Sequence, residues 1–259
     1  MTRGWRRVAF AFVCGAAAAG CFSQPEARSG ALDYLARTGS EEVPEADLKL
    51  TPPLRIGVAL PPSETAAGPS RAGLPPSVRR VAQSTIPERL RQVLLTRLTT
   101  SLQGRAGIGS VDVIPSSYLT AGGGFAELQR AGGAFGYDLV ALVSWDQFQF
   151  GEGGRESFEL GTIAGERSVE GEPNETKTVL DTALFHVASR ELVLHATGES
   201  SVKSDASRDS AEAGFDAAMK DLLARLDTAA AAFAEQLKHG RVHGLGTPEF
   251  DAAAPGGAR

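Results

Sequence analysis

Four residues near the end of a strand-like stretch have the spacing of a lysine-activated serine. They read Ser200-Ser201-Val202-Lys203, and Ser204-Asp205 follow them. A nucleophile of this Ser-x-x-Lys type opens a helix, and its site also needs a Lys-Thr-Gly strand and a Ser-Asp-Asn loop. Here the tetrapeptide ends a predicted strand, the chain has no Lys-Thr-Gly, and residue 206 is Ala. A serine hydrolase that uses Ser200 and Lys203 is therefore only an alternative prediction.

The histidines and one glycine run show no complete metal or phosphate site. His186 and His195 lie on the two arms of a predicted hairpin, and His239 and His243 have an i, i+4 spacing that glycine interrupts. A metal centre would need two further convergent ligands in either place. The run Gly122–Phe125 precedes a predicted helix but lacks the Lys-Ser or Lys-Thr of a phosphate loop, which favours a structural turn. No metal and no cofactor are expected.

A polar and aromatic group follows the most apolar stretch of the chain. Trp145, Asp146 and Gln147 come at the end of a predicted buried strand, which is where open α/β sheets tend to place their sites. The three residues are therefore a candidate surface for a partner or ligand, and a glycan or peptidoglycan ligand is an alternative function. Equally, Trp145 could cap the core while Asp146 and Gln147 bond to loop backbone.

The first 21 residues have the three parts of a bacterial secretory signal. Three arginines precede an apolar run from Val8 to Ala19, and Gly20 and Cys21 follow it. The run is about 12 residues long, whereas a helix needs about 20 to cross a bilayer, so a removable signal is predicted. The chain is expected to lose residues 1–20 and to be acylated at Cys21. Residue 18 is Ala rather than the Leu usual in lipoproteins, which leaves an ordinary signal peptide as the alternative.

Lipidation also accounts for the cysteine content. Cys14 lies within the apolar run and would leave with the signal, so Cys21 would be the one thiol of the mature chain. A single cysteine forms no internal disulfide. Two or three acyl chains hold a protein on a bilayer far more firmly than one chain does. Residue 22 is Phe and not the Asp that retains lipoproteins in the inner membrane, so the outer membrane of a bacterial envelope is the predicted location.

The composition argues against one class of partner. Removing residues 1–20 from the 259 takes three of the 26 basic residues and none of the 31 acidic ones, which leaves 239 residues with a net charge of −8. An acidic chain without a basic block is not expected to bind nucleic acid. Its length allows one large or two small domains.

The order of apolar patterns predicts a single α/β domain with a mixed sheet of about five strands, helices packed on it, and a long C-terminal amphipathic helix. The N-terminal part is predicted as signal (1–20) and acylated flexible tether (21–51), the α/β domain as residues 52–239, and the rest (240–259) as a disordered tail. The predicted strands are 54–60, 111–114, 138–145, one near 158–163, and a hairpin of 176–187 and 191–202, and the predicted helices are 86–102, 125–131 and 209–237.

Four segments together resemble the family of rhombotarget lipoproteins. They are Val113–Leu119, Gly122–Phe125, Leu139–Gln147, and Thr178–Ala183 with Ser189-Arg190. The resemblance covers roughly residues 50–205. It implies a bacterial envelope lipoprotein that is associated with the rhombosortase protein-sorting system and has no established enzymatic activity. The family defines no catalytic residues to transfer to this chain.

One feature departs from the substrates of that sorting system, which end in a glycine-rich motif, an apolar helix and a basic end. This chain ends Pro255-Gly256-Gly257-Ala258-Arg259 without an apolar helix, so it is not expected to be a sortase substrate itself. The main prediction is a non-enzymatic outer-membrane lipoprotein, anchored through Cys21, that binds or scaffolds an envelope protein. Its oligomeric state does not follow from the sequence.

Overall fold

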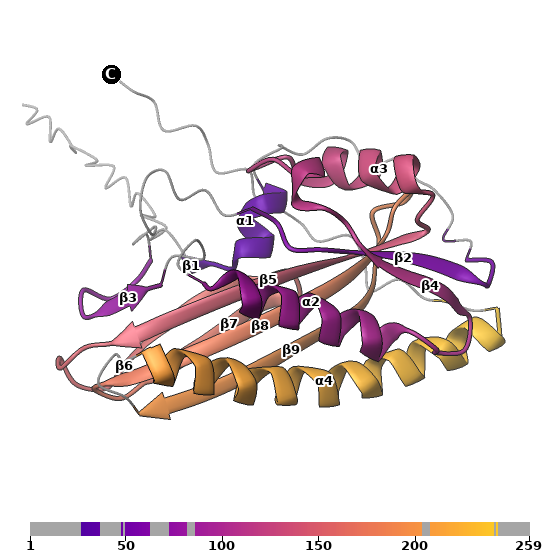
Figure 1. Cartoon of the computed structure of the whole chain (residues 1–259). Coiled ribbons are helices and arrows are strands. Elements are labelled where there is room, and N and C mark those ends of the chain that lie inside the picture. The colour runs from indigo at the N-terminus through magenta and orange to yellow at the C-terminus, as the bar shows by residue number, and fades with distance from the viewer. Residues whose placement is uncertain are drawn as a thin grey trace, which may run out of the picture.

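A mixed sheet of six strands forms the centre of the molecule, in the order β4-β2-β5-β8-β9 with β3 paired to the far part of β5 (Figure 1). The computed structural model describes residues 27–36, 48, 50–62, 73–81, 86–203, 208–240 and 242. β2 runs parallel to β4 and β5, whereas β8 lies between β5 and β9 and runs antiparallel to both. The strands are β2 (Leu54–Ala59), β3 (Val78–Arg80), β4 (Ile108–Val113), β5 (Leu139–Phe150), β8 (Glu175–His186) and β9 (Leu192–Lys203).

The two crossover helices lie on opposite faces of this sheet. α2 (Glu88–Leu102) connects β2 to β4, and α3 (Gly124–Phe135) connects β4 back past β2 to β5. Because the two connections run in opposite directions and right-handed crossovers are strongly preferred, the helices must fall on different faces. Figure 1 shows α3 on one side and α2 with α4 on the other. β5 is therefore covered on both faces, as its nearly continuous apolar sequence predicts.

The C-terminal helix α4 (Arg208–Lys238) lies along β8 and β9 beside α2. Its 31 residues correspond to a length of about 46 Å at 1.5 Å per residue. Its buried side chains form one stripe with steps of mostly three or four positions, as an amphipathic helix requires: Phe215, Ala218, Met219, Leu222, Leu226, Ala230, Phe233, Ala234 and Leu237. At Gly198 of β9 a Cβ atom would lie 2.2 Å from the Ala218 carbonyl oxygen, so glycine allows this close helix–strand approach.

A smaller sheet covers part of the α3 face. Its strands are β1 (Ala27–Arg28), β6 (Glu156–Thr162) and β7 (Gly165–Gly171), in the order β1-β6-β7. Phe158 of β6 packs edge-on against Phe148 of β5, with ring centroids 4.8 Å apart. The helix α1 (Gly30–Ala36) follows β1 and packs in the cluster that also contains α3.

The predicted α/β fold with a mixed sheet, packed helices and a long C-terminal helix is confirmed. The structure differs from the expected tether of residues 21–51, because residues 27–36 form β1 and α1 and pack into the core. These short elements are stabilised by partners far along the chain, which a local pattern does not reveal. The segment 151–175 holds the β6–β7 hairpin rather than one strand. The signal and Cys21 lie outside the described residues.

Candidate functional site

The expected partner surface at Trp145, Asp146 and Gln147 lies inside the protein. β5 continues to Phe150 and does not end at Trp145, because the polar residues that follow find partners within the fold. Trp145 is 4% exposed, Asp146 2% and Gln147 4%. Since successive side chains of a strand point to opposite faces, Asp146 faces away from the other two. The three side chains therefore do not form one exposed surface.

Trp145 and Gln147 face the layer that contains α4. The Trp145 ring stacks on Phe215 of α4, with centroids 4.4 Å apart and an interplanar angle of 21°. The Gln147 side-chain amide donates to the hydroxyl of Thr178 on β8 over 3.1 Å. Trp145 thus joins the sheet to the C-terminal helix, and Gln147 satisfies a buried hydroxyl of the neighbouring strand.

Asp146 connects three elements on the opposite face. Its Oδ2 accepts a hydrogen bond of 3.1 Å from the backbone N–H of Gly30 at the start of α1. Its Oδ1 pairs with Arg80 of β3, and Arg80 also lies 3.9 Å from Asp33 of α1. Burial alone would lower the pKa of Arg80, but the neighbouring carboxylates hold the pKa above its usual value. Asp146 therefore fastens α1 and β3 to β5.

A second carboxylate, Glu127 of α3, fastens the other end of α1. It accepts hydrogen bonds from the hydroxyl of Tyr34 (3.1 Å), from the backbone N–H of Thr120 (2.6 Å) and from the Thr120 hydroxyl (2.6 Å). Arg130 lies 2.9 Å away. Burial works to raise the pKa of Glu127, yet the donors of Thr120 and Tyr34, with Arg130, hold the pKa below its usual range.

Glu127 also explains the glycine run before α3. A Cβ atom on Gly123 would lie 1.9 Å from Glu127 Oε2, and Gly122 and Gly124 adopt positive φ angles of 71° and 57°, which favour glycine. The carboxylate of the chain itself thus occupies the start of α3. The structural turn expected from the sequence is the arrangement observed.

We call β1 and α1 together, residues 27–36, the N-terminal clasp. Five of its side chains are at most 5% exposed: Ala27, Ser29, Ala31, Tyr34 and Leu35. Ala27 pairs with Leu160 of β6, and a Cβ on Gly161 would lie 3.1 Å from Leu32, so the missing side chain leaves room for the clasp. The sequence analysis missed Asp146 and Glu127 as fasteners, because their partners in the clasp are 116 and 93 residues away.

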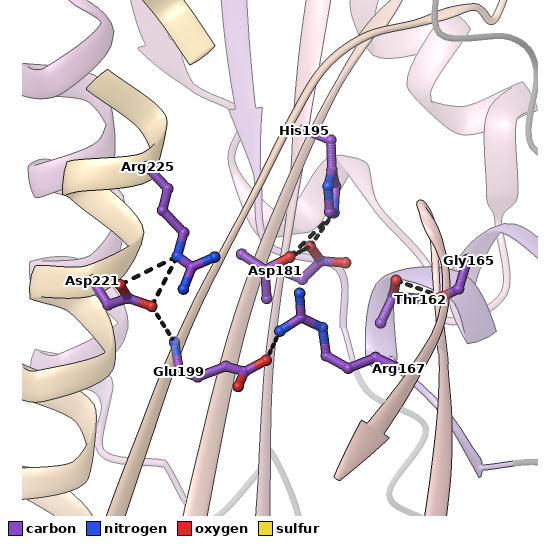
Figure 2. A network of polar contacts seen from close by, with 9 residues as sticks. Thr162, Gly165, Arg167, Asp181, His195, Glu199, Asp221 and Arg225 are labelled. Atoms are coloured by element: carbon purple, nitrogen blue, oxygen red, sulfur yellow. Dashed lines mark hydrogen bonds and ion pairs between the residues drawn. The ribbon is translucent and has the colours of Figure 1, made fainter. Parts of the chain in front are cut away.

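Asp181 and His195 form a pair in the main sheet whose residue types suggest a catalytic role (Figure 2). His195 Nε2 lies 2.5 Å from Asp181 Oδ1 and 3.4 Å from the Thr197 hydroxyl, which donates to the same Oδ1 over 3.0 Å. In a Ser-His-Asp relay the two ring nitrogens separate hydroxyl and carboxylate. Here one nitrogen contacts both groups, so a nitrogen that donates to Asp181 cannot accept the Thr197 proton. The arrangement fits a buried structural network.

Other contacts in the same view connect β7, β9 and α4. Arg167 of β7 pairs with Glu199 of β9, whose backbone N–H donates to Asp221 of α4 over 3.1 Å. Arg225 also binds Asp221 at 3.1 Å. Figure 2 shows these side chains converging on β9. Asp221 thus satisfies an amide of an edge strand, which leaves that amide unavailable for pairing with another chain.

The Ser-x-x-Lys pattern does not assemble a serine and a lysine. Ser200 and Lys203 are three positions apart on β9 and therefore point to opposite faces. The Ser200 hydroxyl donates to the Gly214 carbonyl of α4 over 2.6 Å, and Lys203 pairs with Glu172 over 2.8 Å. The geometry gives no support to a nucleophile at Ser200.

The histidines are likewise apart. His186 and His195 lie on opposite faces of the β8–β9 hairpin, and His186 Nδ1 lies 2.7 Å from the Ser189 hydroxyl. Burial lowers the pKa of His186. Within the described residues, no group of three or more His, Cys, Asp or Glu side chains could hold a metal ion. His243 lies outside these residues. Among the described helices, none is both long and apolar enough to cross a membrane.

A groove on the surface between α2 and α4 is a further candidate for a ligand site among the described residues. Its walls carry both signs of charge, and two arginines of the lining pair with two aspartates of the lining. Arg97 lies 3.6 Å from Asp216, and Arg105 pairs with Asp227. Paired charges at an exposed site do not indicate a recognition site for an ionic ligand.

Comparison with known proteins does not identify a family or a function for this chain. No family model and no curated protein matches the chain. Among solved structures, the chain is similar to a dodecamer of PelC from Paraburkholderia phytofirmans, with 12% sequence identity over 69% of this chain and 92% of that chain. The TM-score is 0.30, which is too low to carry an argument about fold, function or assembly.

Proposed function

We propose that this chain is a lipoprotein of the bacterial envelope, anchored through acylated Cys21 in the outer membrane, since residue 22 is Phe and not Asp. The observation that carries the proposal is the layout of residues 1–21, in which a basic start and a short apolar run lead to Cys21. Cys21 is also the one cysteine that remains when residues 1–20 are removed. An exported protein with a lone cysteine at this position has a direct use for it in lipidation.

The α/β domain acts in this proposal by binding an envelope protein and not by catalysis. Three findings argue against catalysis at the candidate groups. The Ser200 hydroxyl is engaged with Gly214, the carboxylate of Asp146 is engaged with Arg80 and Gly30, and His195 shares one carboxylate oxygen with Thr197. Each candidate catalytic group thus has a structural use. The association with a protein-sorting system, which the family resemblance implies, belongs to the same proposal.

The anchor is tested by fractionating cells that express the wild type or Cys21→Ala. The wild type should sediment with outer membranes and leave them only in detergent. Cys21→Ala should appear in the soluble fraction, because the acyl chains supply the attachment. Ser23→Ala, beside the processing site, is a matched control and should behave as the wild type. Membrane attachment of Cys21→Ala would contradict the proposal.

The binding role is tested separately in intact envelopes. Crosslinking followed by affinity purification of the anchored protein should enrich one envelope protein, and that protein should then bind the purified mature chain in solution. A failure to enrich any envelope protein, with the anchor intact, would contradict the binding role while leaving the location unaffected.

A further inference from the structure

We infer that the lipid anchor holds the domain directly at the membrane surface, with the face that carries β1 and β6 toward the lipid and the face that carries α2 away from it. This inference rests on the proposed lipidation of Cys21. It replaces a long flexible tether with a short link, and it assigns an interaction surface to one side of the molecule. The partner of that surface is the lipid bilayer itself.

The argument starts from the place where the chain enters the core. Ala27 is 5% exposed and pairs with Leu160 of β6. Two residues later, the backbone N–H of Ser29 donates to the Gly161 carbonyl over 2.8 Å. The position of Ala27 is therefore part of the fold and is no longer free to move as a tether would.

Covalent geometry then limits the distance to the anchor. Five residues, 22–26, separate Cys21 from Ala27. A fully extended chain spans at most about 3.6 Å per residue, so the Cα atoms of Cys21 and Ala27 can be no more than about 22 Å apart. A free tether from Cys21 to Thr51 would reach about 110 Å by the same measure. The difference decides whether the domain works at the membrane surface or away from it.

The clasp has specific contacts that oppose its release. To detach α1, the protein would have to leave the buried carboxylates of Asp146 and Glu127 without their partners at Gly30 and Tyr34. It would also expose Ala31, Tyr34 and Leu35, which are at most 3% exposed. Both changes are unfavourable, since a buried charge depends on its hydrogen bonds and buried apolar surface stabilises the fold.

The place of β1 sets the orientation. β1 is an edge strand of the smaller sheet, beside β6, and this sheet covers the face opposite to α2 and α4. In Figure 1, β1 lies toward the end of the molecule that carries β3, and the last turn of α4 lies at the other end. Ser157 of β6 is exposed near β1, whereas Thr100 is exposed near the end of α2 on the opposite face. These two positions should differ in their distance from the lipid.

The test places a fluorophore at Ser157→Cys or at Thr100→Cys in the lipidated, full-length mature protein. The acylated Cys21 does not react with the dye, so each variant takes one label. In vesicles of phosphatidylethanolamine and phosphatidylglycerol with a headgroup quencher, the label at position 157 should be quenched more strongly than the label at position 100. Inserting twenty Gly and Ser residues between Gln24 and Pro25, which precede the described residues, should abolish this difference.

The outcomes separate the inference from the proposed function. Equal quenching at the two positions, in protein that remains bound to the vesicles, would overturn the inference and leave the lipid anchor intact. A difference that persists unchanged with the twenty-residue spacer would also overturn it, because the short link would then not be its cause. Protein that carries no lipid and does not bind vesicles would overturn the proposed function and the inference together.

Discussion

Two buried carboxylates hold the N-terminal clasp on the rest of the fold. Asp146 and Glu127 are 2% and 6% exposed, and each is surrounded by donors from several elements. A buried charge is tolerated when its hydrogen bonds and ion pairs are complete, and removing one partner leaves the other uncompensated. Both side chains therefore act as fasteners of the N-terminal clasp, not as reactive groups.

Replacing Asp146 by Asn should destabilise the protein strongly. The substitution keeps the size of the side chain but leaves the guanidinium of Arg80 facing a neutral group, and loss of one partner of a buried pair costs about 3 kcal/mol or more. Chemical denaturation should report this loss in the free energy of unfolding. Asp227→Asn is the matched control, because Asp227 pairs with Arg105 at an exposed site, where a pair contributes about 0–1 kcal/mol. Equal effects of the two substitutions would show that Asp146 is not a fastener.

Glu127→Gln should change the dependence of stability on pH. The folded state holds the pKa of Glu127 below its usual range, so the carboxylate stabilises the protein fully above an unfolded-state pKa of about 4.3. This contribution is lost as the pH falls through the lowered pKa of the folded state. Wild type and Glu127→Gln should therefore differ most in free energy of unfolding near neutral pH and converge in acid. Tyr34 stays protonated throughout, since its pKa is raised. A difference that is constant from pH 7 to acid would refute the role of the charge.

At the scale of elements, the long helix α4 and the strand β9 approach each other unusually closely. Gly198 allows this approach, because a Cβ atom there would meet the Ala218 carbonyl at 2.2 Å and the Leu222 amide nitrogen at 2.4 Å. Both atoms belong to the backbone of α4 and cannot move as a flexible side chain would. The packing of the last helix on the sheet thus depends on one missing side chain.

Gly198→Ala should therefore destabilise the fold by about 1–3 kcal/mol, the usual cost of overpacking. Gly133→Ala is the matched control, because Gly133 lies within α3 with no heavy atom within 4 Å of its Cβ position. Replacing a glycine inside a helix by alanine stabilises it by about 0.5–1 kcal/mol. Thermal unfolding of the two variants should shift in opposite directions. A Gly198→Ala variant as stable as the wild type would show that α4 is not held so closely.

The elements that could be predicted from sequence are those whose evidence is local. The apolar stripe of α4 and the β8–β9 hairpin show their periodicity within their own residues, and both are confirmed. The extension of β5 through Asp146 and Gln147 could not be predicted, since the partners Arg80 and Thr178 are 66 and 31 residues away. The clasp could not be predicted for the same reason, because its partners are also far along the chain. A short polar segment looks like a tether until the distant groups that bury it are known.

At the scale of the whole molecule, the proposed anchor and the clasp would act together. Cys21 would supply the attachment, and the clasp would keep the attachment short, since Ala27 belongs to the core. The α2 and α4 side of the sheet would then be the side that faces partners in the envelope. Under the proposed function, this arrangement would give a scaffold with a fixed orientation at the lipid surface.

The central claim is the acylation of Cys21, and the intact mass of the protein purified from membranes tests it most directly. The account predicts a chain of residues 21–259 whose mass exceeds that of the polypeptide by a diacylglyceryl group, with or without a further acyl chain. The extra mass should map to the N-terminal peptide. A chain that starts elsewhere, or one that starts at Cys21 with a free thiol, would contradict the account.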